Sequence, residues 1–394
     1  MMERRGTPDF FLLLMTFLFV GFGIVMVFSA SAPVAAYEFG DNLFFMKKQL
    51  VSAALGTFLM FIVMNIPYTK LKKGYLPFFL GVLGLLFLVL LQPSDARPKS
   101  WIDLGMFSIQ PAEFAKLAII LYLASLITKK GENFSQFRKG LLPVALVVGF
   151  VGGLILLQPD FGTFIVFLCC STIVIVTGGA NLRHLLMGAT SLGAAAVVLI
   201  GGQMLAGELS IYQMKRFDCF VNPWQDPQNW CYQHVQAEMA FGHGGVGGVG
   251  FGQSVQKLFY LPEAQNDYIF AIIGEELGLI GSSIFLLLFL AFLWRGIVVS
   301  LRCPDMYGTI VGVGIVGMFG IQAFINIGGV IRAIPMTGIT LPFISYGGSS
   351  MLVSLLSMGI LLSISRDQVN RTEKRAEKKK GRSRVPEQIP LIRS

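Results

Sequence analysis

Ten long apolar runs dominate this chain and constrain its fold more than any other feature. An α-helix needs about 20 apolar residues to cross the hydrocarbon core of a bilayer, and each run is close to that length. The sequence therefore predicts an all-α membrane protein with ten transmembrane helices, at about residues 10–31, 49–66, 75–92, 110–128, 141–158, 161–178, 185–205, 268–293, 309–330 and 343–364.

The composition of the chain agrees with this interpretation. Of the 394 residues, 54% are hydrophobic and 13% are charged, whereas about a quarter of the residues in a soluble domain are charged. These values exclude a soluble enzyme, a disordered chain and a disulfide scaffold. The first run ends in Ser-Ala-Ser-Ala, which imitates a signal-peptide cleavage site. Its apolar core is too long for a signal peptide, so an uncleaved helix is expected.

The distribution of Lys and Arg orients the helices. With the N-terminus in the cytoplasm, 22 of the 31 Lys and Arg residues fall in cytoplasmic segments and eight in external ones. Positive charge gathers on the cytoplasmic side of membrane proteins, so both termini are expected there. One large extracytoplasmic loop, residues 206–267, then lies between helices 7 and 8.

The chain is expected to divide into a polytopic membrane domain, residues 1–365, and a basic cytoplasmic tail, residues 366–394. The tail holds ten Lys and Arg residues. It is expected to lie disordered against anionic lipid. Nucleic-acid binding is not expected, because no aromatic residue interleaves the basic run.

The five cysteines divide between the membrane, the cytoplasm and the large external loop. Cys169 and Cys170 fall in a predicted helix, and Cys303 falls in a cytoplasmic segment. Cys219 and Cys231 both fall in the external loop. An external compartment permits a disulfide between them, and two unpaired thiols are the alternative.

Two charged residues, Glu113 and Lys116, lie inside the fourth predicted helix. Three positions apart on a helix, they share one face and neutralise each other. They form either a structural ion pair or part of a polar cavity, since charge inside a membrane is costly and commonly marks function. Asp160, in the outer turn between the fifth and sixth helices, fits a helix cap.

A glycine-rich stretch, FGHGGVGGVGFGQ, spans residues 241–253. It contains a formal G-x-G-x-x-G, but no βαβ unit surrounds it and it lies on the external side, which argues against a nucleotide site. We expect a loop with exposed backbone at the membrane surface. The phosphate-binding pattern G-x-x-x-x-G-K-[ST] does not occur in the sequence. His234 and His243 lack thiolates at zinc-site spacing, so a structural zinc is not expected.

Asp267 stands immediately before the eighth predicted helix, on its external side, in Leu-Pro-Glu-Ala-Gln-Asn-Asp-Tyr. Aspartate is well suited to cap a helix N-terminus, and from this position alone capping is the favoured interpretation. A functional carboxylate is the alternative.

The stretch around Asp267 resembles a known family. Residues 250–281 read GFGQSVQKLFYLPEAQNDYIFAIIGEELGLIG and resemble the SEDS family of cell-wall polymerases, which includes FtsW, RodA and SpoVE. The form S-x-Q-K-x-x-Y-L-P-E-A is closer to the FtsW and SpoVE branch than to RodA. Further motifs of the family follow the expected order: S-W-I at 100–102, Q-P-A-E-F-A-K at 110–116, Q-P-D-F-G-T at 158–163, N-P-W-Q-D-P at 222–227 and P-M-T-G-I-T-L-P-F-I-S-Y-G-G-S-S at 335–350.

This resemblance implies a peptidoglycan glycosyltransferase in the bacterial cytoplasmic membrane. Such an enzyme polymerises lipid II into glycan strands at the outer face of the membrane, with inversion and with undecaprenyl pyrophosphate as the leaving group. Because the donor carries its own leaving group, no nucleotide is required. The FtsW-like features favour a role in cell division at the septum, with elongation and sporulation as alternatives.

The resemblance also implies site residues. Asp267 is the implied catalytic residue, either as general base on the acceptor sugar or as ligand of a divalent cation, Mg²⁺ or Mn²⁺, held against the pyrophosphate. A site that binds metal through protein side chains alone is not expected. The basic members of the substrate-binding set are expected to neutralise the pyrophosphate. That set consists of Lys116, Glu113, Asp160, Lys99, Arg216, Lys257 and Glu263.

The implied partners are lipid II, a class B penicillin-binding protein that acts as transpeptidase, other division proteins and membrane lipids. Two other functions stay open: a lipid II flippase or secondary transporter, which intramembrane charges and glycine-rich breaks also suit, and a non-catalytic scaffold of the division machinery. The chain departs from the usual family pattern at Asn266 and Tyr268 beside Asp267, and Arg332 stands where the family commonly has a small residue.

Overall fold

The computed structural model describes residues 6–92, 100–103, 105, 108–158, 160–181, 183–184, 186 and 218–382, with side chains as far as residue 367. The described chain is helical apart from one antiparallel ladder, in which β1, Ile102–Asp103, pairs with β2, Ser108–Ile109. The predicted all-α class is therefore confirmed.

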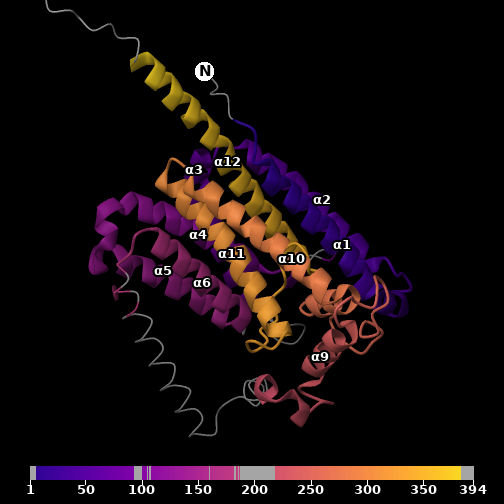
Figure 1. The fold of residues 1–394 in the computed structure, drawn as a ribbon. Helices are drawn as coiled ribbons and strands as arrows, with labels where there is room; N and C mark the ends of the chain where they lie inside the picture. The colour runs from indigo at the N-terminus through magenta and orange to yellow at the C-terminus, as the bar shows by residue number, and fades with distance from the viewer. Residues whose placement is uncertain are drawn as a thin grey trace, which may run out of the picture.

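Ten longer helices make up the described fold, and Figure 1 shows their arrangement. Short helical turns occupy Gly131–Ser135, Phe137–Leu141 and Pro223–Gln225. The longer helices are α1 Phe10–Phe39, α2 Phe44–Asn65, α3 Tyr68–Leu90, α4 Pro111–Lys130, α5 Leu142–Leu156, α6 Phe161–Thr177, α9 Tyr232–Gly244, α10 Ile269–Leu301, α11 Met306–Val330 and α12 Gly348–Arg382.

Eight segments, which contain α1 to α5 and α10 to α12, are long and apolar enough to cross a membrane, and α6 is a shorter apolar helix. These nine coincide with nine of the ten predicted runs. An integral membrane protein is thereby confirmed. The remaining run, 185–205, lies outside the described residues apart from residue 186. The count of ten and the full extent of the loop between helices 7 and 8 therefore stay predictions.

The described start of the chain and Arg366 of α12 lie together at one end of the bundle, which we call the basic face. The amide of Gly6 donates to the carbonyl of Arg366 at 3.1 Å, and Asp9 pairs with Arg295 of α10 at 2.6 Å. In Figure 1 the N-terminus and the continuation of α12 lie at this end, and α9 lies at the opposite end, which we call the loop face. The prediction that both ends share a side is confirmed for these residues, and assignment of that side to the cytoplasm stays a prediction.

The centre of the bundle contains α4 and α12. In their membrane-spanning windows 78% and 83% of the residues are buried, against 22% in α3 at the periphery. Glycines allow close approach between α2 and α12, because a Cβ on Gly359 would lie 2.8 Å from the carbonyl oxygen of Met60. Small residues at helix contacts let membrane helices pack by van der Waals contact alone.

The helix α10 breaks at Gly278, whose φ of 67° and ψ of −169° are not helical. The glycine-rich segment 245–252, which we call the glycine strap, packs on this break. The amides of Val249 and Gly250 donate to the carbonyls of Glu275 and Glu276, at 3.0 and 3.1 Å. The strap also accepts two hydrogen bonds from α10 just beyond the break. Residues 241–244 of the predicted loop belong to α9. The strap itself is exposed at most of its residues, as predicted for a surface loop, and part of its backbone pairs with α10.

The break lies near the loop-face boundary of the membrane. From Gly278 to Leu301 the helix continues for about 34 Å, which is close to the thickness of the hydrocarbon core. Water is scarce at this depth, so free amide and carbonyl groups are unfavourable. Val246 and Phe251 of the strap lie beside the break, with 64% and 51% of their surface exposed. Exposed apolar side chains suit the boundary of the membrane.

Two further features of the structure concern the external cysteines and the C-terminal segment. Cys219 and Cys231 form a disulfide, which decides between the two alternatives for these cysteines. The helix α12 crosses residue 366 without a break and ends at Arg382. The division into a membrane domain and a separate tail stays a prediction.

Replacing Gly278 by Ala tests the contact between the glycine strap and α10. The added Cβ would lie 2.2 Å from the amide nitrogen of Gly248, at a position with positive φ. We expect the free energy of unfolding to fall by about 2 kcal/mol or more, seen as a lower apparent Tm in detergent. Gly84→Ala in α3 is the control, because nothing lies within 4 Å of its Cβ. An equal loss in both variants would contradict this account.

Candidate active site

Asp267 lies in the turn that leads into α10, with its side chain partly buried. The capping position of α10 is Tyr268, which makes no side-chain cap hydrogen bond. The capping position therefore lies one residue later than the sequence predicted, at Tyr268 and not at Asp267. The carboxylate lies instead against the loop between α11 and α12.

Asn326 holds the backbone of Asp267, and Gly338 lies beside its side chain. The amide of Asn326 on α11, which is fully buried, donates to the carbonyls of Asp267 and Ile339, both at 2.7 Å. The carboxylate oxygen Oδ2 lies 3.3 Å from the point where a Cβ on Gly338 would stand. Gly338 has a φ of +75°, a conformation that glycine adopts without strain.

Asp160 caps α6, as its position in the sequence predicted. One carboxylate oxygen accepts from the amide of Thr163 at 3.0 Å, and the other accepts from the side chain of Gln110 at 2.7 Å. A Cβ on Gly162 would lie 2.4 Å from the carbonyl oxygen of Thr337. The start of α6 therefore packs directly on the residue before Gly338, which links the surroundings of Asp160 to those of Asp267.

Glu113 and Lys116 form an ion pair of 2.6 Å on the first turns of α4, and both side chains are buried. The spacing predicted this pair, and the structure confirms it. Position near the start of α4 places the pair at the loop-face end of the membrane. A contact of either residue with substrate stays a prediction.

The other predicted substrate-binding residues lie in different surroundings. Lys257 is buried and pairs with Glu276 of α10 at 2.8 Å. Glu263 is exposed and accepts a hydrogen bond from Asn266, the residue before Asp267. Lys99 and Arg216 lie outside the described residues.

Two neighbouring carboxylates in α10 were missed by the sequence analysis. Glu275 is fully buried and accepts from the amide of Val255 at 2.9 Å and from the hydroxyl of Ser254, and it contacts Nδ1 of His243 at 2.8 Å. Glu276 is 1% exposed. The signal was present, because two adjacent acids inside an apolar run are costly to bury and commonly mark a functional region.

Backbone strain concentrates around Asp267. Among the described residues, four non-glycine residues have positive φ, and they lie in the loop before α10 and in the loop between α11 and α12. These loops meet at Asp267, where the amide of Tyr346 also donates to the carbonyl of Gln265 at 2.9 Å. Such residues persist only where the surroundings over-determine them, and they cluster at functional sites. The four are Phe259, Glu263, Arg332 and Phe343.

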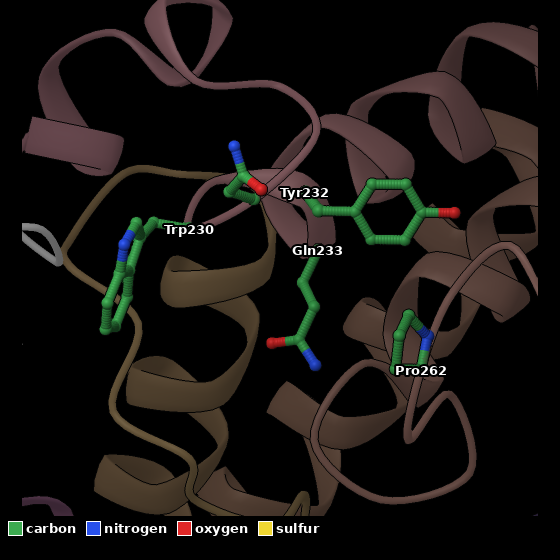
Figure 2. A pocket seen from close by; sticks show the side chains of 5 residues that line it. Trp230, Tyr232, Gln233 and Pro262 are labelled. Atoms are coloured by element: carbon green, nitrogen blue, oxygen red, sulfur yellow. The ribbon is translucent and has the colours of Figure 1, made fainter.

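A surface hollow of about 410 Å³ lies near this region, between α9 and the loop before α10. Figure 2 shows its labelled side chains, of which Pro262 precedes Asp267 by five residues. Its size is in the range of small-ligand pockets. None of the predicted site residues lines it; the lining consists of Asn229, Trp230, Tyr232, Gln233 and Pro262.

The fold and this site together define a class: an integral membrane protein whose polar and strained residues gather at one end of a helical bundle. The profile of the FtsW, RodA and SpoVE family, described as cell cycle protein, matches residues 10–370. The chain belongs to this family.

The relatives and a solved structure cover nearly the whole chain. Stage V sporulation protein E of Bacillus subtilis (strain 168) is 44% identical, over 93% of this chain and 99% of its own length. A probable peptidoglycan glycosyltransferase FtsW of Geobacter sp. (strain M18) is 37% identical, over 92% and 98%. A chain from a peptidoglycan synthase complex that coordinates polymerization and crosslinking has a TM-score of 0.74 at 28% identity, over 92% and 98%.

Breaking the Glu113–Lys116 pair tests whether it is needed for folding. Removal of one partner, as in Glu113→Gln, leaves a buried ammonium without compensation, so we expect a loss of about 3–5 kcal/mol in the free energy of unfolding. The double variant Glu113→Gln/Lys116→Met removes both charges and should recover much of that loss. Apparent Tm in detergent measures both. A single variant as stable as the parent would show that the pair is dispensable.

Proposed function

We propose that this protein is a peptidoglycan glycosyltransferase that polymerises lipid II at the outer face of the cytoplasmic membrane for cell division. Two observations support this. The FtsW relative that carries the glycosyltransferase name is similar over almost the whole chain. Asp267 lies at the loop face, where two strained loops and a buried asparagine hold it. The second observation carries the proposal, because the backbone that bears this carboxylate is anchored at the loop face, as a catalytic role would require.

In the proposed reaction, Asp267 removes the proton from the 4-hydroxyl of the acceptor N-acetylglucosamine. That oxygen forms a bond to C1 of the donor N-acetylmuramic acid while the bond from C1 to the pyrophosphate oxygen breaks, with inversion at C1. The electron pair leaves with undecaprenyl pyrophosphate. A carboxylate within hydrogen-bond reach of the hydroxyl suits this role of general base.

The neighbours of Asp267 contribute orientation and charge. Asn326 fixes the backbone of Asp267, and Gly338 leaves room for the carboxylate. Asp160 holds Gln110 beside the start of α6. Lys116, together with Lys99 and Arg216, is proposed to stabilise the departing pyrophosphate, a role that charge-assisted hydrogen bonds serve well.

Binding a divalent cation is an alternative role for Asp267. No group of three or more His, Cys, Asp or Glu side chains suited to a metal occurs in the described parts of the chain. Mg²⁺ commonly binds through one or two carboxylates together with substrate phosphates. Asp267 fits that donor set as the protein ligand, with the pyrophosphate as the other. A bound cation would neutralise charge on the leaving group.

The proposed orientation places the loop face outside the cell. Disulfides persist in oxidising compartments, so the Cys219–Cys231 bond on the loop face supports an external location. We propose a class B penicillin-binding protein as partner, since the similar solved chain belongs to a complex that coordinates polymerization and crosslinking. Action at the division septum, with other division proteins, belongs to the same proposal.

Lipid transport is the second candidate, and the break in α10 favours it. Broken helices form the binding sites of many secondary transporters, near the middle of the membrane. In this chain the break lies near the loop-face boundary, and the glycine strap occupies its backbone groups. A lipid II translocation assay run beside the polymerisation assay separates the two functions.

Asp267→Asn tests the catalytic assignment, because it removes the basic oxygen with little change in size. We expect purified Asp267→Asn protein to form no detectable glycan from lipid II, at least about 100-fold below the parent. Its apparent Tm should remain close to that of the parent. Glycan synthesis at the parent rate would refute the assignment.

Gly338→Ala tests the contact beside the carboxylate. Its Cβ would stand 3.3 Å from Oδ2 of Asp267, so we expect polymerisation to fall by about 10-fold or more. Gly40→Ala is the matched control, because Gly40 also has positive φ but has nothing within 4 Å of its Cβ. Equal losses in the two variants would mean that backbone strain alone explains the effect.

A further inference from the structure

Lys257, Glu276 and Ser29 form a buried polar cluster that the proposed reaction does not use. The ammonium of Lys257 donates to Glu276 Oε1 at 2.8 Å and to Ser29 Oγ at 3.0 Å. The hydroxyl of Ser29 donates to the same Glu276 oxygen at 2.6 Å. All three residues are buried. They come from three separate segments: the loop before α10, α10 itself and α1.

A buried ion pair of this kind is weak evidence for stability. Removing two charges from water costs about as much as their attraction returns, and apolar replacements of similar volume are often as stable. The better-attested value of such a pair is that it specifies one arrangement of the chain over others. The positions of Lys257 and Glu276 along the chain show which arrangement their pair specifies.

The Lys257–Glu276 pair closes a ring of chain that has Asp267 at its far point. Lys257 precedes Asp267 by ten residues, and Glu276 follows it by nine. Glu275 closes the same ring again, by accepting from the amide of Val255 at 2.9 Å. Ser29 attaches the closed ring to α1. Asp267 is therefore held at the middle of a segment whose two ends are joined.

The second arm of this ring is closely packed, and the first arm is anchored at a few buried residues between exposed ones. On the first arm, the amide of Leu261 donates to the carbonyl of Gln256 at 2.8 Å, and Leu261 and Ala264 are buried. The second arm is the first segment of α10, in which every residue from Ile269 to Glu276 is buried. Close-packed interiors transmit strain, so a displacement of Glu276 at the closure is transmitted through the buried start of α10 to Asp267.

We infer that Lys257 and Glu276 are positioning residues for Asp267, with Ser29 as their anchor on α1. In this arrangement the ammonium of Lys257 neutralises Glu276 and is not a ligand of the pyrophosphate. The inference rests on the proposed function, in which Asp267 catalyses glycan polymerisation. The inference predicts that substitution of Lys257 or Glu276 lowers kcat, whereas the proposed function predicts that substitution of Asp267 abolishes polymerisation.

The first test measures kcat and KM for lipid II with the purified full-length chain. For Lys257→Met and Glu276→Gln we expect kcat to fall by about 10- to 100-fold, because small displacements of a catalytic group have effects of that size. KM should stay within about twofold, since neither residue touches substrate. Lys257→Arg keeps the positive charge and should retain more activity than Lys257→Met.

Two double variants separate positioning from stability. Lys257→Met/Glu276→Met removes both charges, so we expect it to recover the apparent Tm lost in the single variants but not kcat. Lys257→Glu/Glu276→Lys restores an ion pair in the reverse direction, and we expect it to recover most of kcat. A role in folding alone predicts that kcat follows Tm in all of these variants.

Lys47→Met is the control, because it breaks an exposed ion pair with Asp41, 2.7 Å long, at the same face. It should leave both constants unchanged. An increase in KM for Lys257→Met at unchanged kcat would show that Lys257 binds the pyrophosphate and would overturn the inference. Full kcat in the neutral double variant would overturn it as well. Retained polymerisation by Asp267→Asn would instead refute the proposed function.

Discussion

Backbone amide and carbonyl groups at the edge of a bilayer must be paired, and this requirement organises the loop face. The helix α10 breaks at Gly278, and the glycine strap supplies partners on both sides of the break. Without them, polar groups would face lipid. The same contact lays the following residues, 253–257, along α10. Glu275 and Glu276 thereby meet the amides, hydroxyl and ammonium that make their burial possible.

The position of Asp267 follows from this arrangement. Its loop is closed on α10 at one end and joined to the loop between α11 and α12 at the other, through Asn326 and the amide of Tyr346. Phe259 and Arg332, one in each of these two loops, have positive φ, and strained residues of this kind cluster at functional sites. These contacts fix the backbone at Asp267, as the proposed general-base chemistry on a sugar hydroxyl requires.

Local patterns in the sequence predicted much of the fold and part of the site. Apolar runs predicted nine of the ten longer helices described, because the free energy of placing a run in lipid depends on the run itself. The spacing of Glu113 and Lys116 predicted their ion pair, and the place of Asp160 in a turn predicted its cap. The capping position of α10 was predicted one residue too early, since it falls at Tyr268 and not at Asp267.

The partners of Glu276 could not be predicted from local sequence patterns. Its partner Lys257 lies 19 residues away, and its partner Ser29 lies 247 residues away. A spacing within one helix relates residues a few positions apart, whereas these contacts exist only because the strap folds back on α10 and α1 packs beside it. Membrane insertion and family could be predicted from the linear order of residues, since each depends on composition or short motifs. The same order predicts sidedness. Which buried charge meets which partner was decided by the tertiary structure, because electrostatic pairing depends on distance in space and not on distance along the chain.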